Sequence, residues 1–371
     1  MRKVLLFPDF DKFGGTRTFF KNLIDFYLSN DYLVVTAIEK ERCDQDILEF
    51  LTKNRIKIIF LSERYRCGIF SRFHISEIIT DLINGIPIIV RERPEIVVVS
   101  TAYPGKFLGL IVLFHVKLIY ILHSYPTCVS KVNRILLRTS LNANTRILAV
   151  SKFSMNQISK YWLPGRRQKY LQYIYNFSDL ENNSRSFVSS ERKGSKKILT
   201  LGHVRWYKNP DIWYSVALKT IEKYQGDVEF LWAGEGDLLD FFRDKIEKAH
   251  ISNIKFLGFQ RNIAELYSQC DIYFQPSLME SHGIAVVDAM IMGLPSVVSN
   301  TGGLPESVVD GITGYVINPS DTDTMVEKLL TLLEDENLRK SMGMAGKERY
   351  KTKFSQDRWI KEMKTFHEKL G

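Results

Sequence analysis

Two carboxylate side chains, Glu280 and Asp288, are separated by seven residues in the second half of the chain. Paired carboxylates can act as general acid and base at a glycosidic bond. A single carboxylate can also accept paired hydrogen bonds from vicinal hydroxyl groups of a sugar or a ribose. Which of these chemistries is possible depends on the elements that hold the two groups.

The segment around the two acids predicts a loop, a helix and a strand, in that order. Residues 284–292 have a helical pattern, Gly293 suits the position after a helix end, and Pro295 prevents the helix from continuing. Glu280 therefore precedes a helix, and Asp288 lies about one and a half turns inside it. The first backbone N–H groups of such a helix are free to meet an anion or hydroxyl groups. They are the N–H groups of Gly283 and Ile284, which follow Ser281 and His282.

Two basic side chains follow the first strand that we predict in the second half, at residues 198–201. Arg205 and Lys208 are three positions apart, just before a helix predicted at residues 211–224. One turn of backbone could aim both cations at the same diphosphate. An exposed basic loop without a ligand is the alternative.

A glycine pair follows the first strand of the chain, which we predict at residues 4–7. Gly14 and Gly15, with Thr16 after them, precede a predicted helix. Glycines there let backbone N–H groups approach a phosphate closely. The spacing differs from GxGxxG, so a dinucleotide fingerprint is absent, and a plain loop is the alternative.

Three further segments lie at ends of predicted strands, where sites of α/β proteins occur. Residues 233–237 and Phe259 each follow a strand in glycine-containing turns. His123 ends an apolar strand, and a lone histidine there is either structural or part of a site.

The order of these motifs resembles the retaining GT-B glycosyltransferases of family 4. Glu280 occupies the first acidic position of the family's donor segment, and Asp288 stands where the family usually has Glu. Lys208 matches the family's lysine. His203 holds the usual arginine position, so Arg205 is a shifted candidate for the arginine role.

The resemblance implies a role for each motif. Glu280 would bind hydroxyls of the donor sugar, and Asp288 those of the ribose. His123 would lie near the reacting sugar, which makes it and Glu280 the expected catalytic residues. The expected donor site comprises Gly14, Gly15, Thr16, Arg205, Lys208, Phe259, Glu280, Ser281, His282, Gly283, Ile284 and Asp288.

Strands alternate with helices along the whole chain, which predicts parallel sheets covered by helices on both faces. We expect an α/β protein with a Rossmann-like domain at residues 1–179, a polar linker at 180–197 and a second Rossmann-like domain at 198–350. The resemblance implies the GT-B arrangement, with the two domains facing across a cleft and a final helix, residues 351–371, returning to the first domain.

Charge is uneven along the chain, which has a net charge of +9. Residues 91–180 contain 13 basic and 3 acidic side chains, a net charge of +10. Such a surface could meet anionic lipid, an acidic acceptor or nucleic acid, or it could be a solvated face without a partner. We expect an anionic membrane surface there and no nucleic acid.

Compartment and metal content follow from a few residue types. The four cysteines are scattered without a CxxC pair, which fits a reducing cytoplasm. A peripheral position on the inner face of the membrane is compatible with this. The apolar run at 107–122 is too short and too broken to span a bilayer, and predicts a buried helix and then a strand.

Two DxD strings, at Asp9 and at Asp321, suggest no metal, because Asp321 suits a helix cap. We expect no essential metal and no other cofactor.

We therefore expect a retaining, metal-independent hexosyl- or N-acetylhexosaminyl-transferase. The donor would be a nucleotide-diphospho-sugar, a UDP-sugar before a GDP-sugar, and the acceptor a glycan or a lipid-linked molecule in cell-surface polysaccharide or glycoconjugate synthesis. Asp288 and His203 leave a second interpretation open, a degenerate binding subunit without activity. A sugar-nucleotide epimerase on a similar fold is a third, for which no acid–base pair can be placed.

Overall fold

A computed structural model describes residues 2–10, 14–61, 75–112, 116–128, 131–163, 169–180 and 194–370. The chain divides into two compact units. The first combines Met1–Asn176 with the C-terminal Trp359–Gly371, and the second is Phe177–Arg358. Most of the predicted linker, residues 181–193, lies outside the described residues.

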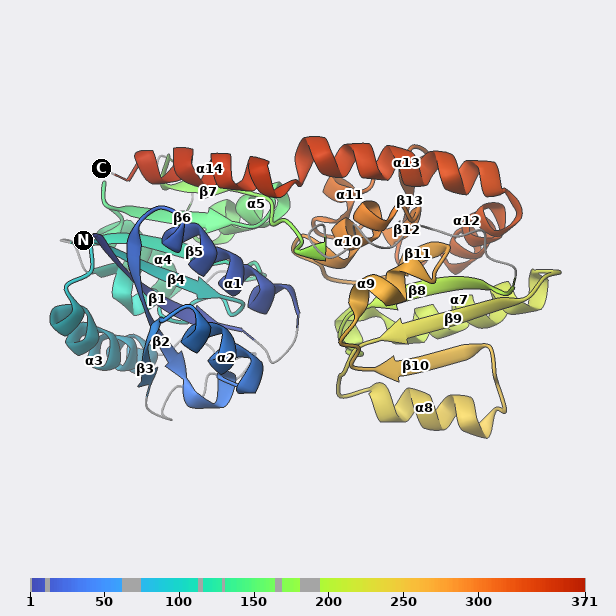
Figure 1. Cartoon of the computed structure of the whole chain (residues 1–371), viewed down its shortest axis with the longest axis horizontal. Coiled ribbons are helices and arrows are strands. Elements are labelled where there is room, and N and C mark those ends of the chain that lie inside the picture. Colours follow the sequence, from blue (N-terminus) through green and yellow to red (C-terminus); the bar gives the residue numbers. More distant parts are fainter. Residues whose placement is uncertain are drawn as a thin grey trace. The chain divides into compact units, whose positions relative to one another are not determined.

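The first unit is built on a parallel sheet whose strand order is β3-β2-β1-β4-β5-β6-β7 (Figure 1). Its strands are β1 (Arg2–Asp9), β2 (Tyr32–Glu39), β3 (Lys57–Leu61), β4 (Ile96–Thr101), β5 (Lys117–Leu122), β6 (Thr145–Ala149) and β7 (Leu171–Tyr173). Its helices before the second unit are α1 (Gly15–Leu28), η1 (Lys40–Arg42), α2 (Gln45–Lys53), α3 (Ile75–Glu92), η2 (Leu108–Val112), α4 (Lys131–Ser140) and α5 (Lys152–Tyr161).

The first sheet is apolar along its central strands because helices cover both of its faces. Every residue of β4 is buried, and so are all but the first two of β1. Strand order runs outward from β1 to β3 and then returns to β4 beside β1. The carboxyl ends of β1 and β4 are therefore a topological switch point.

Several elements of the first unit differ from the sequence prediction. The predicted helix after residue 107 is only the short 3-10 helix η2, although β5 follows as expected. Helices α4 and α5 and strand β7 were not predicted. Helix α3 continues past Gly85 and Pro87 to Glu92, beyond the predicted end at residue 83. Pro87 is exposed, so the helix tolerates its missing N–H on the solvent side.

The C-terminal helix α14 (Gln356–Glu368) joins the first unit from Trp359 onward (Figure 1). The ring of Trp359 packs edge-on against Phe19 of α1, with centroids 5.9 Å apart. His367 Nε2 lies 3.1 Å from the hydroxyl of Tyr27. These contacts agree with the expectation that the last helix returns to the first domain.

The second unit contains a parallel sheet with the strand order β10-β9-β8-β11-β12-β13. Its strands are β8 (Lys196–Leu201), β9 (Val228–Ala233), β10 (Ile254–Gly258), β11 (Ile272–Gln275), β12 (Ser296–Ser299) and β13 (Gly314–Ile317). Its helices are η4 (Trp206–Lys208), α7 (Pro210–Lys223), α8 (Leu239–Lys248), α9 (Ile263–Ser268), α10 (Ile284–Met292), α11 (Leu304–Ser307), α12 (Thr322–Glu334) and α13 (Glu336–Lys353). Strand β13 and helix α11 were not predicted, and Asp321 caps α12 as expected.

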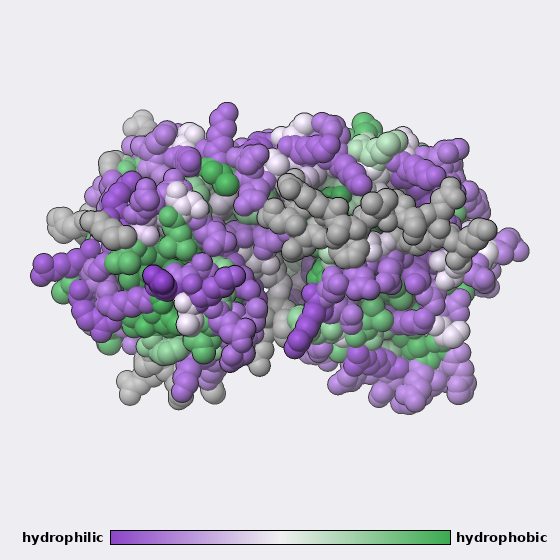
Figure 2. All heavy atoms as spheres, viewed as in Figure 1, coloured by the Kyte–Doolittle hydropathy of each residue, from purple (hydrophilic) through white to green (hydrophobic). Residues whose placement is uncertain are grey.

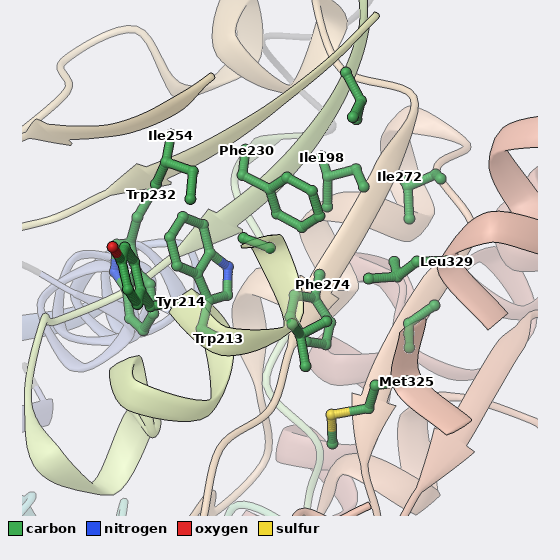
Figure 3. Close-up of a cluster of buried hydrophobic side chains, with 14 of the residues drawn as sticks. Ile198, Trp213, Tyr214, Phe230, Trp232, Ile254, Ile272, Phe274, Met325 and Leu329 are labelled. Carbon is green, nitrogen blue, oxygen red and sulfur yellow. The ribbon is translucent and has the colours of Figure 1, made fainter. Parts of the chain in front are cut away.

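Large aromatic side chains fill the core of the second unit (Figure 3). Trp213 of α7 lies against Trp232 of β9, with ring centroids 5.1 Å apart, and both side chains are fully buried. Their indole N–H groups donate to Thr200 Oγ1 at 2.6 Å and to the Gly202 carbonyl at 2.9 Å. Because buried indole N–H groups need acceptors, this core also fixes the loop that follows β8.

Hydrophilic side chains dominate the face of the molecule in Figure 2, with hydrophobic ones showing in smaller groups. Within the apolar run at 107–122, residues 108–112 form η2 and residues 117–122 form β5. Within the described part of the chain, no helix has both the length and the apolar character needed to cross a membrane.

Candidate functional site

The strand order of the second sheet reverses between β8 and β11, so the loops after these two strands meet at a switch point. Backbone hydrogen bonds tie the loops together: Leu278 N donates to the Tyr207 carbonyl at 2.8 Å. The side chain of Asn209 donates to the Pro276 carbonyl at 3.1 Å. The topology therefore places the predicted basic loop and the predicted acidic loop side by side.

Lys208 and Glu280 form an ion pair at this switch point. Their side chains retain 14% and 16% of their exposure, so a ligand can still reach both groups. Burial alone would lower the pKa of Lys208, but the carboxylate of Glu280 outweighs it and the pKa is raised. Lys208 therefore stays protonated at neutral pH, as a cation for a diphosphate must.

Gln275, at the end of β11, fixes the other side of the Glu280 carboxylate. Its Nε2 donates to Glu280 Oε2 at 2.8 Å and to Ser277 Oγ at 3.1 Å. The hydroxyl of Tyr273 donates to Gln275 Oε1 at 2.7 Å. Gln275 and Tyr273 are almost completely buried, so this chain of donors sets the orientation of Glu280. Sequence reasoning missed both residues, because an apolar strand gives no sign of an inward-pointing amide.

The N-terminus of α10 opens directly beside Glu280. Gly283 precedes the helix with φ 86°, and no side chain caps it. The loop after β12 closes on the same point, since Gly303 N donates to the Glu280 carbonyl at 3.0 Å. A Cβ atom at Gly302 would lie 1.7 Å from that carbonyl oxygen, so only glycine fits. The first amides of α10, including that of Ile284, are thus positioned for an anion.

Ser281 and His282 have different surroundings in this loop. Ser281 N donates to Glu280 Oε1 at 3.2 Å. The ring of His282 is buried beside Phe354, with centroids 5.6 Å apart. Burial lowers the pKa of His282 to about 4, so the imidazole is neutral at physiological pH.

Asp288 lies inside α10, as predicted, and is buried. It accepts a hydrogen bond from the hydroxyl of Ser178. Burial raises the pKa of Asp288 to about 7, although the Ser178 hydrogen bond acts in the opposite direction. A hydroxyl donor already meets this carboxyl group, which is the contact that a ribose hydroxyl would make.

Arg205 points to a different partner from Lys208. Its Nε lies 3.8 Å from Asp237 Oδ1, in the loop after β9. The next loop joins this one, because Phe259 N donates to Glu235 Oε1 at 2.9 Å. The two glycine-containing turns predicted after these strands therefore lie together at the carboxyl ends of β9 and β10.

The remaining predicted residues belong to the first unit. Gly14 precedes α1, whose first turn contains Gly15 and Thr16, and no side chain caps this helix. His123 follows β5, where its Nε2 lies 2.9 Å from Ser100 Oγ and its ring packs on Phe19 at 4.5 Å. Burial lowers the pKa of His123 to about 3, which keeps the imidazole neutral.

The switch point of the first unit contains a buried ion pair that sequence reasoning did not find. Lys106 Nζ lies 2.7 Å from Asp9 Oδ1, and the exposure of these side chains is 4% and 0%. Thr101 Oγ1 donates to Asp9 Oδ2 at 3.0 Å, and Lys106 also reaches Glu39 at 2.8 Å. Asp9 of the first DxD string is thus engaged by cations and a hydroxyl, while Asp11 lies outside the described residues.

The second unit matches a family model described as glycosyl transferases group 1, over residues 182–349. Residues 182–349 are therefore similar to that family. An N-acetyl-α-D-glucosaminyl L-malate synthase from Bacillus anthracis is 26% identical over 270 residues, which is 71% of this chain and 68% of that protein. An uncharacterised glycosyltransferase from Methanocaldococcus jannaschii is 30% identical over 147 residues, 39% of this chain and 42% of the relative. Lys208, Glu280 and Asp288 all fall within the group 1 segment.

Solved glycosyltransferase structures resemble the chain over its whole length. One from Rickettsia africae ESF-5 has a TM-score of 0.81 at 15% identity and covers 100% of this chain and 98% of its own. HepE from Anabaena, in complex with UDP and glucose, has a TM-score of 0.79 at 18% identity and covers 99% and 100%. At these identities the likeness shows the fold: the chain has the GT-B fold with two Rossmann-like domains, as the motifs predicted.

Proposed function

We propose that the chain transfers a sugar from a nucleotide-diphospho-sugar to an acceptor hydroxyl, with retention of the anomeric configuration. The ion pair of Lys208 and Glu280 carries the proposal, because it stands beside the uncapped N-terminus of α10 at a switch point. Lys208 supplies a cation for a diphosphate, the helix supplies amides, and Glu280 supplies a carboxylate for sugar hydroxyls.

A UDP-sugar is the donor we favour, and a GDP-sugar is next. Two relatives are named as N-acetylglucosaminyl-transferring enzymes, the Bacillus anthracis protein and a 2-deoxystreptamine N-acetyl-D-glucosaminyltransferase from Niallia circulans. HepE of similar fold was crystallised with UDP-glucose. These names support a hexose or an N-acetylhexosamine as the sugar.

The acceptor we propose is a glycan or a lipid-linked molecule on the cytoplasmic side of a membrane. A capsular polysaccharide glycosyltransferase from Staphylococcus aureus is 30% identical over 89 residues, 24% of this chain and 23% of the relative. The positive charge of residues 91–180 fits an anionic acceptor or membrane surface and supports this assignment.

Retention is proposed to occur by attack on the same face of the sugar as the leaving diphosphate. Lys208 and the amides at the start of α10 would stabilise the charge that develops on the diphosphate. The departing phosphate would take the proton of the acceptor hydroxyl. Glu280 is held by Lys208 and Gln275, which suits a role in binding hydroxyls better than one as a nucleophile. A glycosyl-enzyme adduct found by mass spectrometry would contradict this route.

Thermal shift with UDP, GDP, ADP and CMP, each with and without EDTA, tests the proposal. A ligand at a hundred times its dissociation constant adds about 2.7 kcal/mol of stability, which is easily measured. A shift with one diphosphate that EDTA leaves unchanged would establish the base and the proposed metal independence.

Thermal shift and two product assays separate the alternative functions. Stabilisation by no nucleotide would favour the degenerate binding subunit, in which Asp288 and His203 replace the family's usual residues. Conversion of the bound sugar without any acceptor would favour the epimerase. Transfer to an acceptor, followed by NMR of the product, would support the proposed reaction and its stereochemistry.

A further inference from the structure

Helix α3 exposes a row of large apolar side chains to solvent. The exposure is 49% at Ile79, 66% at Ile83, 37% at Ile86 and 66% at Val90. Steps of four, three and four residues place these side chains on one face over three turns. We call this row the α3 stripe. Scattered exposed apolar residues are ordinary, but a continuous row on one helix marks an interaction surface.

The face of α3 opposite the α3 stripe packs against the first unit, so the stripe is not needed to hold the helix in place. Ile89 is buried in the core, and Gly85 packs so closely on Leu110 that a Cβ atom would lie 2.4 Å from its Cδ2. The acids of this face are also turned inward: Asp81 accepts from Gly109 N at 3.1 Å, and Glu92 is 3% exposed. From Ile79 to Glu92 the solvent-facing side therefore presents no carboxylate.

Basic residues follow the stripe at the end of α3. Arg91 and Arg93, with Arg2 and Lys3 of β1, line an open depression of about 620 Å³. Two acids share this depression. Glu92 pairs with Lys57 at 2.8 Å, with Arg91 at 3.0 Å and with Lys3 at 3.5 Å, and Glu95 pairs with Arg2 at 3.0 Å, so the cations outnumber the acids. The apolar row thus ends in a patch with an excess of positive charge.

We propose that the α3 stripe and the adjoining basic depression form a docking surface for an anionic lipid bilayer. An apolar helix face beside cations is the combination that lies in a membrane interface, with side chains among the acyl chains and cations at lipid phosphates. A second copy of the chain fits less well, because a stable interface buries about 800 Å² on each partner, more than four side chains on one helix provide.

This proposal deepens the membrane-proximal acceptor of the proposed function, but its test does not depend on sugar transfer. It also narrows the expected membrane contact from the broad region 91–180 to α3 and the depression at its end, which includes Arg91 and Arg93. Binding is measured without any sugar nucleotide, so a failed donor site and a failed membrane surface give separate results.

Co-sedimentation of the full chain with vesicles tests the surface. One set contains phosphatidylcholine alone, and in the other phosphatidylglycerol replaces part of it. The double variant Ile83→Gln/Val90→Gln removes exposed apolar area with little effect on the core, and Arg93→Gln removes one cation. Ile135→Gln on α4 is the matched control, since Ile135 is 62% exposed in the basic region 91–180.

We expect binding to the anionic vesicles only, weakened at least about five-fold by the α3 double variant and about five-fold by Arg93→Gln. Ile135→Gln should bind like the wild type, and all variants should keep the wild-type melting temperature. Equal loss with Ile135→Gln would move the surface to α4 and overturn the proposal. Wild-type binding by the double variant would also overturn the proposal. A concentration-dependent dimer in sedimentation analysis that the double variant abolishes would overturn it too.

Discussion

Each of the two units has a parallel sheet with a switch point at the carboxyl ends of its strands, yet the two switch points are built differently. In the first unit, Lys106 and Asp9 pair at 4% and 0% exposure and have further partners in Thr101 and Glu39. In the second, Lys208 and Glu280 pair at 14% and 16% exposure beside an uncapped helix.

The difference shows how one topology serves two purposes. A lysine–carboxylate pair that is sealed from solvent and surrounded by further partners can only hold loops together. A pair that remains accessible can be opened by a ligand whose phosphates and hydroxyls replace the contacts that the two side chains make with each other. Burial, more than residue type, therefore separates the structural pair from the candidate site.

Breaking the sealed pair should cause a large loss of stability. Lys106→Met leaves the buried carboxylate of Asp9 with Arg42 at 3.6 Å as its remaining ion-pair partner, and should cost about 3 kcal/mol of unfolding free energy. Urea denaturation measures this loss. Lys21→Met is the control, because its pair with Asp46 is exposed and should contribute less than about 1 kcal/mol. Equal stability of the two variants would show that the pair at Asp9 is not structural.

Breaking the accessible pair should affect activity more than stability. Lys208→Ala removes the cation proposed to face the diphosphate and should lower kcat about 100-fold or more, comparable with the loss of one oxyanion donor. Steady-state kinetics with the donor identified by thermal shift measures it. Lys219→Ala, which breaks an exposed pair with Asp323, should leave kcat unchanged. A Lys208→Ala enzyme with normal kcat would exclude the proposed role.

The pH dependence of stability should reveal the buried acid of the second unit. Burial raises the pKa of Asp288 to about 7, so the folded state holds a proton that the unfolded state releases above about pH 4. This contribution is complete at low pH and is lost as pH rises to about 7. Asp288→Asn should flatten this decline in the free energy of unfolding. The difference is up to about 4 kcal/mol, because each pKa unit corresponds to about 1.4 kcal/mol. An unchanged slope in urea denaturation from acid to neutral pH would contradict the assignment.

The smallest effect should come from the donor chain behind Glu280. Gln275→Leu removes the hydrogen bond to the carboxylate and should weaken transfer about ten-fold, roughly the worth of one such bond to a charged group. Gln275→Glu instead replaces the donor with a second carboxylate beside Glu280, and repulsion between the two like charges should weaken transfer more than Gln275→Leu does. Steady-state kinetics of the two variants measures both losses. Wild-type activity in both variants would assign Gln275 to packing alone.

Much of the fold could be predicted from the sequence, and the second unit more closely than the first. Strands β9, β11 and β12 and helices α9 and α10 have the predicted bounds, because apolar runs there end at glycine, proline or polar residues. In the first unit, the helix predicted to end at residue 83 is α3, which extends to Glu92. The helix continues because Gly85 fits against Leu110 and Pro87 faces solvent.

Within the candidate site, the sequence identified the groups that face one another at the second switch point. Lys208, Glu280 and the start of α10 were all predicted from their places after strands. Gln275 and Tyr273 were not, since their role depends on which way side chains of a buried strand point. Asp9 and Lys106 were missed because they are 97 residues apart and only the pairing of β1 with β4 brings their loops together.

The sequence by itself determined most of the order of strands and helices, the division into two α/β halves and the motifs at strand ends, because each depends on residues close together in the chain. Tertiary structure alone decided which charged groups are sealed and which stay accessible, and which helix presents an apolar face to solvent. Those properties depend on burial, which is set by residues far apart in the chain, and so local patterns could not reveal them.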